Sequence, residues 1–384
     1  MNAVRAVDLE DTDGLMTADR EGLLRAVAMA GAQVRAVAAA QEEGALAPLS
    51  DAGDRPRSVI WVAGRGTAET AGFMLAATLG AVAAEPFVVA SAAPPWIGTL
   101  DVLIVAGEDP GDPALVNAAA TGVRRGARVV VVAPYEGPLR DSTAGRVAVL
   151  EPRLWIPDGF GLCRYLAAGL AAVHAVDPRL RMDLAALAAE LDAEALRNSV
   201  ARQVFTNPAK ALAERLAGRR VVLAGDCPAT LALARHGGSV LLRVARQAAA
   251  ATGLGDAMVA LRAGADEGAG QSGSYAERSI FHDDEIDGPL PERLRVLALT
   301  LADERAVVAA RIAGFADADL IAAGDVPEVA LQGRGASGGE LGEAIGDAHG
   351  WMASPGGAGR AEQQLAVLAV RLEMAAVYLR LGRG

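Results

Sequence analysis

The residues best suited to proton transfer lie in one stretch, residues 279–288, which reads SIFHDDEIDG. The stretch contains His282, one of four histidines in 384 residues, and four of the next five residues are Asp or Glu. Nearby negative charge raises the pKa of an imidazole, so a histidine among carboxylates can act as an acid, a base or a proton shuttle. The same composition also suits a solvated acidic loop, and the elements around the stretch have to distinguish the two interpretations.

A glycine-containing turn is the second feature with possible chemistry. Residues 59–63 form a short apolar run, residues 64–67 read GRGT, and an Ala-rich segment follows, an order typical of the start of a βα unit. The dinucleotide-binding fingerprint requires a third glycine where Glu69 stands, and a glutamate at a helix start repels a pyrophosphate. We therefore expect no nicotinamide or flavin cofactor, although an unrelated nucleotide-binding α/β protein remains an alternative.

Charge, cysteines and histidines limit the possible partners. The net charge of −11 and the lack of a basic tract argue against nucleic acid and anionic membranes. Cys163 and Cys227 have neither metal-ligand spacing nor a disulfide pattern, which fits a reducing cytoplasm. The N-terminus does not resemble a signal peptide, and no apolar run is long enough for a membrane span. We expect a cytoplasmic protein without a metal site, because the histidines are also too scattered to share one.

Short apolar runs alternate with helical segments along most of the chain. The runs that predict strands are residues 59–63, 87–90, 102–105, 128–133, 147–150, 220–225, 293–302 and 320–323. Such alternation predicts parallel sheets covered by helices on both faces, with sites at the carboxyl ends of the strands. The length fits two α/β halves. We expect a helical segment over residues 1–50 and domains over 51–185 and 186–384, the second closed by an amphipathic helix over 361–381.

The region between the predicted strands of the second half is harder to assign. Its patterns predict a helix over residues 229–235, a strand over 239–242 and a helix over 245–252. Residues 264–274 are rich in Gly, Ala and Ser and predict a loop.

Six short motifs along the chain have a characteristic order. They are GRG at 64–66, PR at 152–153, PDGF at 157–160, NPAKALA at 207–213, FHDDEIDG at 281–288 and EMAAVYL at 373–379. This order resembles that of the bifunctional phosphoglucose/phosphomannose isomerases of the SIS (sugar isomerase) superfamily. The resemblance covers residues from about 55 to 381 and rests mostly on order and spacing. Its most specific part is the His282 stretch, where the family has an H-N-E-I-x-G type sequence.

The resemblance implies two SIS-like three-layer αβα domains with parallel sheets, in a homodimer with the site between subunits. It implies an aldose–ketose isomerase that acts on glucose 6-phosphate or mannose 6-phosphate and needs no metal or cofactor. His282 would help to open the sugar ring, and Glu285 or Glu277 would be the base. The residues expected to contact the phosphosugar are Gly64, Arg65, Gly66, Thr67, Arg153 and Lys210.

The sequence also departs from the family pattern. Residues 106–113 read AGEDPGDP, where the family has an S-x-S-G-N-T-E-E type phosphate loop. Three carboxylates repel a phosphate and two prolines remove backbone donors, so we expect phosphate binding to be weaker by roughly tenfold or more. Residues 241–250, the counterpart of the segment with the family's catalytic glutamate, contain no carboxylate, and no lysine follows the closing helix. The alternative is therefore a non-catalytic sugar-binding protein, or a partner-binding regulator of mannose-phosphate metabolism.

Overall fold

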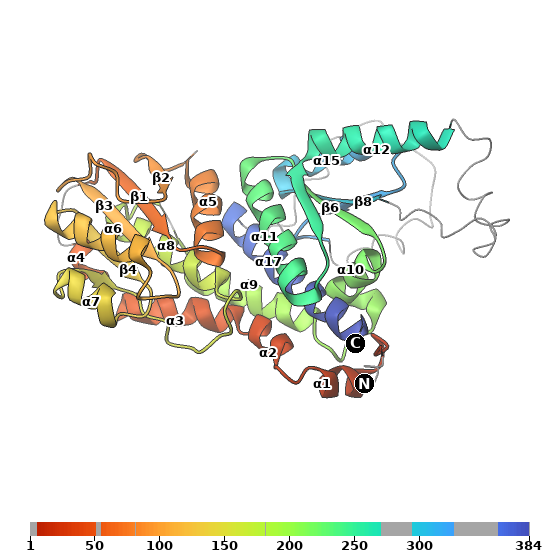
Figure 1. The fold of residues 1–384 in the computed structure, drawn as a ribbon, viewed down its shortest axis with the longest axis horizontal. Coiled ribbons are helices and arrows are strands. Elements are labelled where there is room, and N and C mark those ends of the chain that lie inside the picture. Colours follow the sequence, from red (N-terminus) through yellow and green to blue (C-terminus); the bar gives the residue numbers. More distant parts are fainter. Residues whose placement is uncertain are drawn as a thin grey trace, which may run out of the picture.

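The computed structural model describes residues 6–50, 55–80, 82–180, 182–269, 294–325 and 360–383. These residues form two lobes, each built on a parallel sheet (Figure 1). The first sheet has the order β2-β1-β3-β4-β5 and the second has the order β7-β6-β8-β9. The predicted fold class, two α/β domains with parallel sheets, is confirmed.

Most of the predicted strands are also present at the expected positions. The first sheet contains β1 (Ser58–Ala63), β2 (Phe87–Ala90), β3 (Asp101–Ala106), β4 (Arg128–Val132) and β5 (Ala148–Val149). The second contains β6 (Arg220–Gly225), β7 (Ala249–Gly253), β8 (Leu294–Leu299) and β9 (Ala318–Ile321). In the first sheet β1 is paired with β2 on one side and β3 on the other, and in the second sheet β6 is paired with β7 and β8 in the same way.

Helices cover both faces of each sheet. On the faces that meet in the centre of the molecule lie α5 (Thr67–Leu79), α8 (Leu162–Val176), α10 (Pro208–Leu216) and α11 (Pro228–Ala245). On the outer faces lie α6 (Pro113–Arg124), α7 (Gly137–Thr143), α12 (Leu254–Ala269) and α15 (Arg305–Ile312). The strands alternate between these layers: Val59 and Trp61 of β1 belong to the central core, whereas Ile60 and Val62 face the outer helices. Burial on both faces explains why the strands read as continuous apolar runs.

The N-terminal helices and the last helix join the two lobes. The N-terminal helices are α1 (Thr12–Ala18), α2 (Leu23–Ala28), α3 (Ala30–Glu42) and α4 (Ala47–Ser50), and α9 (Leu184–Arg197) follows the first lobe. Helix α3 packs against α8 and α9. The last helix, α17 (Ala361–Arg383), contacts α5 and α8 of one lobe and α10 and α11 of the other (Figure 1). The helix predicted over 361–381 is present, but it is buried on all sides between residues 365 and 379 and is therefore not amphipathic.

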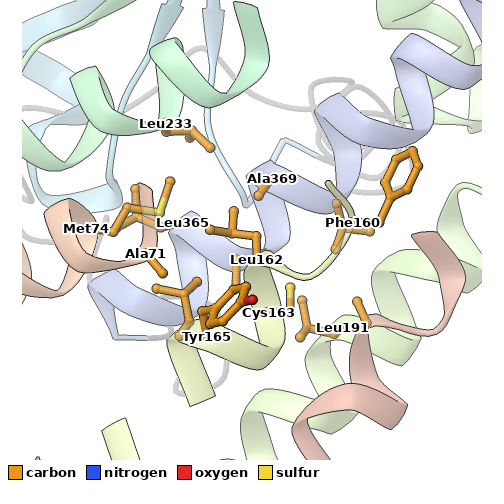
Figure 2. Close-up of a cluster of buried hydrophobic side chains, with 14 of the residues drawn as sticks. Ala71, Met74, Phe160, Leu162, Cys163, Tyr165, Leu191, Leu233, Leu365 and Ala369 are labelled. Atoms are coloured by element: carbon orange, nitrogen blue, oxygen red, sulfur yellow. The ribbon is translucent and has the colours of Figure 1, made fainter. Parts of the chain in front are cut away.

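One continuous core runs between the lobes. Figure 2 shows side chains of five helices meeting there, among them Met74 of α5, Tyr165 of α8, Leu191 of α9, Leu233 of α11 and Leu365 of α17. Phe160 and Leu162, just before and at the start of α8, are buried in the same cluster (Figure 2). Their burial fixes the turn that leads into α8, which is part of the candidate site.

The predictions for residues 229–269 were partly wrong. Residues 239–242 belong to the single helix α11, and residues 249–252 of the predicted helix over 245–252 belong to strand β7. Residues 264–269 belong to α12 rather than to a loop. Strand β7 reads AAATG, a sequence with low strand propensity, and pairing with β6 decides its structure.

Gly225 at the end of β6 is required by the close approach of α11. A Cβ at this position would lie 2.3 Å from the backbone nitrogen of Leu231, which cannot move independently of the helix. We expect Gly225→Ala to lower the free energy of unfolding by about 1–3 kcal/mol, measured by urea denaturation. Gly253 is paired with Gly225 in the sheet, and a Cβ placed on Gly253 would have no atom within 4 Å. Gly253→Ala should therefore change the free energy of unfolding by less than about 0.5 kcal/mol. Equal effects of the two substitutions would contradict this account.

Candidate functional site

The three residues predicted to act as acid or base, His282, Glu277 and Glu285, lie outside the described residues. Their roles therefore stay predictions. The described part of the chain has another set of titratable groups at the carboxyl edge of the first sheet, and these define the candidate site.

Two loops meet at this edge between β1 and β3. The chain leaves β1 for β2 on one side of β1, and β3 lies on the other side. The amide of Gly64 donates to the carbonyl of Ala106 at 2.7 Å, and a Cβ on Gly64 would lie 3.5 Å from the Cα of Gly107. The two glycines therefore allow the loops to touch. Ligands of open parallel sheets bind in the crevice at such a point.

Two carboxylates lie near this crevice: Asp112, with Oδ2 3.7 Å from a Cβ placed on Gly64, and Glu108. A Cβ placed on Gly161 would lie 3.5 Å from Glu108 Oε1 and 3.8 Å from Thr67 Oγ1, so both side chains reach the turn before α8. Partial burial raises the pKa of Glu108, and the charge of Asp158 adds to the rise, while a hydrogen bond from the backbone of Gly159 and two nearby arginines oppose it. Because its side chain remains accessible to solvent, Glu108 has the properties of a general acid or base.

The other two carboxylates of this loop have structural contacts. Asp109 Oδ1 accepts from the amide of Gly111 at 2.7 Å. Asp112 is the N-cap of α6, and its Oδ1 accepts from the amide of Ala114 at 2.8 Å. Of the three carboxylates expected to repel a phosphate, only Glu108 lines the cavity described next.

A cavity of about 320 Å³ opens beside Glu108. It lies between α3, the loops after β3, β4 and β5, and the start of α8. Its charged and amide-bearing lining residues are Gln33, Glu108, Glu151, Arg153, Asp158 and Arg164. The volume is at the lower end of the range for small-molecule sites.

Two residues that line this cavity each have a buried side-chain atom without a hydrogen-bond partner among the described residues. Gln33 is 3% exposed; its Nε2 donates to the carbonyl of Phe160 at 3.0 Å, but its Oε1 accepts no hydrogen bond from the described residues. Arg164 Nη2 donates to the Tyr165 hydroxyl at 2.6 Å, whereas Nη1 has no acceptor among the described residues. Buried polar atoms nearly always have partners, and an unpaired one costs about 1–3 kcal/mol. One unpaired acceptor and one unpaired donor thus belong to residues that line the same cavity. Sequence reasoning missed both residues.

The predicted phosphosugar contacts of the first lobe are only partly brought together. Thr67 is buried at the start of α5, and Gly66 takes a positive φ of 84° as its N-cap, whereas Arg65 is exposed. Arg153 lines the cavity, but Glu43 already binds its guanidinium, with Nη1 donating to Oε1 at 2.8 Å.

Lys210, the predicted contact from the second half, lies elsewhere. Its side chain is fully buried, and Nζ donates to the carbonyls of Val200 and Arg202 at 2.8 Å each. The ammonium group also lies 5.5 Å from the ring centroid of Tyr378. Burial lowers the pKa of Lys210. These contacts fix the start of α10, and a phosphate contact by Lys210 stays a prediction.

Within the described ranges, no group of three or more His, Cys, Asp or Glu side chains is arranged to hold a metal ion. None of the helices in these ranges is both long and apolar enough to cross a membrane.

The raised pKa of Glu108 leads to a pH-dependent prediction. The folded state disfavours the charged carboxylate, so stability falls as the pH rises from the ordinary value of 4.5 through the raised pKa. We expect Glu108→Gln to increase the urea midpoint at pH 7, and the gain should vanish below pH 4.5. Asp109→Asn is the control, since Asp109 only bonds its own loop. A gain that persists unchanged in acid would contradict the raised pKa of Glu108.

The described fold was compared with known proteins. No protein-family model matches the sequence, and no curated protein matches it either. Solved structures do match. A proposed phosphosugar isomerase from Silicibacter pomeroyi is 14% identical with a TM-score of 0.56, and the match covers 92% of this chain and 95% of that one.

Two other structures are similar over nearly the whole chain. The tagatose-6-phosphate ketose/aldose isomerase of Escherichia coli is 13% identical, with coverage of 98% and 95% and a TM-score of 0.55. The C-terminal domain of glucosamine-fructose-6-phosphate aminotransferase from Francisella tularensis is 10% identical, with coverage of 94% and 96% and a TM-score of 0.56. At these identities the similarity shows the fold alone: two α/β units with parallel sheets, as in these solved structures.

Proposed function

We propose that this protein binds a sugar or sugar derivative, with hydroxyl groups of the ligand in the cavity between Gln33, Glu108 and Arg164. The observation that carries this proposal is the pair of unpaired buried atoms. A hydroxyl group can accept from Arg164 Nη1 and donate to Gln33 Oε1, whereas a fully ionised anion has no proton to donate. The double-SIS fold, which the solved phosphosugar isomerase shares, supports the same ligand class.

The rest of the cavity lining suits a polyhydroxylated ligand. Glu108, Glu151 and Asp158 offer carboxylate oxygens, which form strong hydrogen bonds with hydroxyl donors. Trp155 also lines the cavity and is 84% exposed, so its indole ring is free to cover the apolar face of a sugar ring. Few polar groups around an aromatic wall are typical of small-molecule sites.

A second candidate function is aldose–ketose isomerisation of glucose 6-phosphate or mannose 6-phosphate. The observation that favours it is the raised pKa of Glu108 in a solvent-accessible cavity. Isomerisation through an enediol needs a carboxylate that takes a proton from the carbon beside the carbonyl and returns it to the neighbouring carbon. His282 would open the ring, and Glu285 or Glu277 would be an alternative base. The sequence resemblance further suggests a cytoplasmic homodimer, which light scattering would test.

Calorimetry and a coupled assay separate these functions. We expect heat of binding from at least one of glucose, mannose, fructose or their 6-phosphates. A ligand at 100 times its Kd should also stabilise the protein by about 2.7 kcal/mol in thermal unfolding. Formation of fructose 6-phosphate that is lost in His282→Ala or Glu108→Gln would establish the isomerase. Binding without turnover at high enzyme concentration would establish the non-catalytic alternative, and the absence of both would overturn the proposal.

A further inference from the structure

Each sheet has one point where an anionic ligand would be expected. In open parallel sheets, ligands bind where neighbouring strands connect in opposite directions, and helix N-termini there attract anions. In the first sheet this point lies between β1 and β3, and in the second it lies between β6 and β8. In each crevice, a carboxylate of the protein lies where the anion would be expected.

In the second crevice the carboxylate is Asp226, which follows β6. Its Oδ1 accepts from Thr230 Oγ1 at 2.7 Å, and its Oδ2 accepts from Thr300 Oγ1 at 3.0 Å. Thr230 lies in the first turn of α11, Thr300 follows β8, and both are fully buried. The two hydroxyl groups that could have donated to a bound phosphate are therefore used by Asp226.

In the first crevice Asp112 caps α6, with Oδ2 3.7 Å from a Cβ placed on Gly64, and the second carboxylate is Glu108. Its Oε1 lies 3.5 Å from a Cβ placed on Gly161, and it accepts a backbone hydrogen bond from Gly159, before α8. The charged groups that face it are Asp158, Arg164 and Arg243. Arg243 is held by the carbonyls of Asp158 and Gly159, to which it donates at 3.4 and 3.3 Å.

The cavity beside Glu108 is acidic overall. Its lining contains three carboxylates, those of Glu108, Glu151 and Asp158, and two guanidinium groups, those of Arg153 and Arg164. Glu43 already neutralises Arg153. A phosphate dianion in this cavity meets net repulsion, whereas an uncharged hydroxyl group does not, and an ammonium group is attracted.

We infer that the sugar bound in this cavity carries no phosphate, and that a sugar with an amino group binds most tightly. This inference rests on the proposed sugar binding and specifies its ligand class. The carboxylates of Glu108 and Asp226 take the places of a bound anion in the two crevices. The cavity beside Glu108 offers acceptors for hydroxyl and ammonium donors.

Matched pairs of ligands test the inference by calorimetry on the full-length protein. The pairs are mannose with mannose 6-phosphate and glucosamine with glucosamine 6-phosphate. We expect each phosphate ester to bind at least tenfold more weakly than its parent sugar, and glucosamine to bind more tightly than mannose. Glu108→Gln should reduce the discrimination against the phosphate ester severalfold. Asp109→Asn removes a charge from the same loop but outside the cavity. It should leave the discrimination against the phosphate ester unchanged.

The outcomes separate this inference from the function on which it rests. A phosphate ester that binds as tightly as its parent sugar, or more tightly, would overturn the inference and leave sugar binding intact. A failure of all four ligands to bind at millimolar concentration would overturn sugar binding as well.

Discussion

Arg371→Met is expected to lower the free energy of unfolding by about 3–5 kcal/mol, because it leaves the buried carboxylate of Glu194 without its main cation. Arg371 is 3% exposed, and its Nε and Nη2 donate to Glu194 Oε1 and Oε2 at 2.7 and 3.2 Å. Nη1 and Nη2 also donate to the carbonyls of Ala322 and Ala323, just after β9. The guanidinium thus joins α17, α9 and the second sheet at one buried point.

The ion pair of Arg371 with Glu194 should also affect how the free energy of unfolding changes at acidic pH. Burial alone would raise the pKa of Glu194, but the charges and hydrogen bonds of Arg371, Arg197 and Asn198 lower it overall. A lowered carboxyl pKa gives stability that is complete above the ordinary value of 4.5 and is lost as the pH falls through the folded-state pKa. Without Arg371 the pKa of Glu194 rises, so we expect this acid-dependent loss to be smaller in Arg371→Met than in the native protein.

Two variants serve as controls for the Arg371 prediction, measured by urea denaturation. Arg35→Met breaks an exposed ion pair with Asp192 on the same helix, α9, and should cost no more than about 1 kcal/mol. Combining Arg371→Met with Glu194→Leu removes both charges and should recover part of the lost stability. Equal midpoints for Arg371→Met and Arg35→Met would show that the buried pair does not hold these elements together.

Arg164→Met should weaken sugar binding by roughly 10- to 100-fold, the largest effect expected on ligand affinity. A hydrogen bond to a charged group contributes about 1.5–3 kcal/mol, and Arg164 Nη1 is the free donor in the cavity. Gln33→Leu removes the free acceptor and should weaken binding about fivefold to tenfold, because the partner is a neutral amide.

Arg153→Met is the matched control for that experiment. Arg153 lines the same cavity, but its guanidinium is already bound to Glu43, so we expect a change in Kd of less than about threefold. Equal losses of affinity in Arg153→Met and Arg164→Met would indicate that overall charge, and not the free donor, controls binding.

The fold could be predicted wherever a strand is buried on both faces. The runs that became β1, β3 and β6 are rich in Val, Ile and Leu, since both helical layers cover them. Strand β7 could not be predicted in this way, because its residues are Ala, Thr and Gly and its structure depends on β6. Helix α17 was misjudged for a similar reason: Arg371 and Glu373 look like surface residues in the sequence but have buried partners.

The candidate site was predictable only in part. The loops after β1 and β3 were expected at the carboxyl edge of the sheet, and the structure places them in contact there. Gln33 and Arg164 could not be found from spacing, because they lie on helices far apart in the chain and meet only around the cavity. The one signal for Gln33 is an amide within the apolar segment GAQVRAV. Lys210 lies in the NPAKALA motif, which forms the start of α10, and its ammonium group contacts backbone carbonyls.

A crystal structure of the native protein, soaked with the sugar that binds most tightly in calorimetry, tests the proposed function most directly. We expect a sugar ring in the cavity of about 320 Å³, with hydroxyl groups within hydrogen-bond distance of Gln33 Oε1 and Arg164 Nη1. A sugar bound elsewhere on the molecule, with both of these atoms still unpaired, would contradict the proposal.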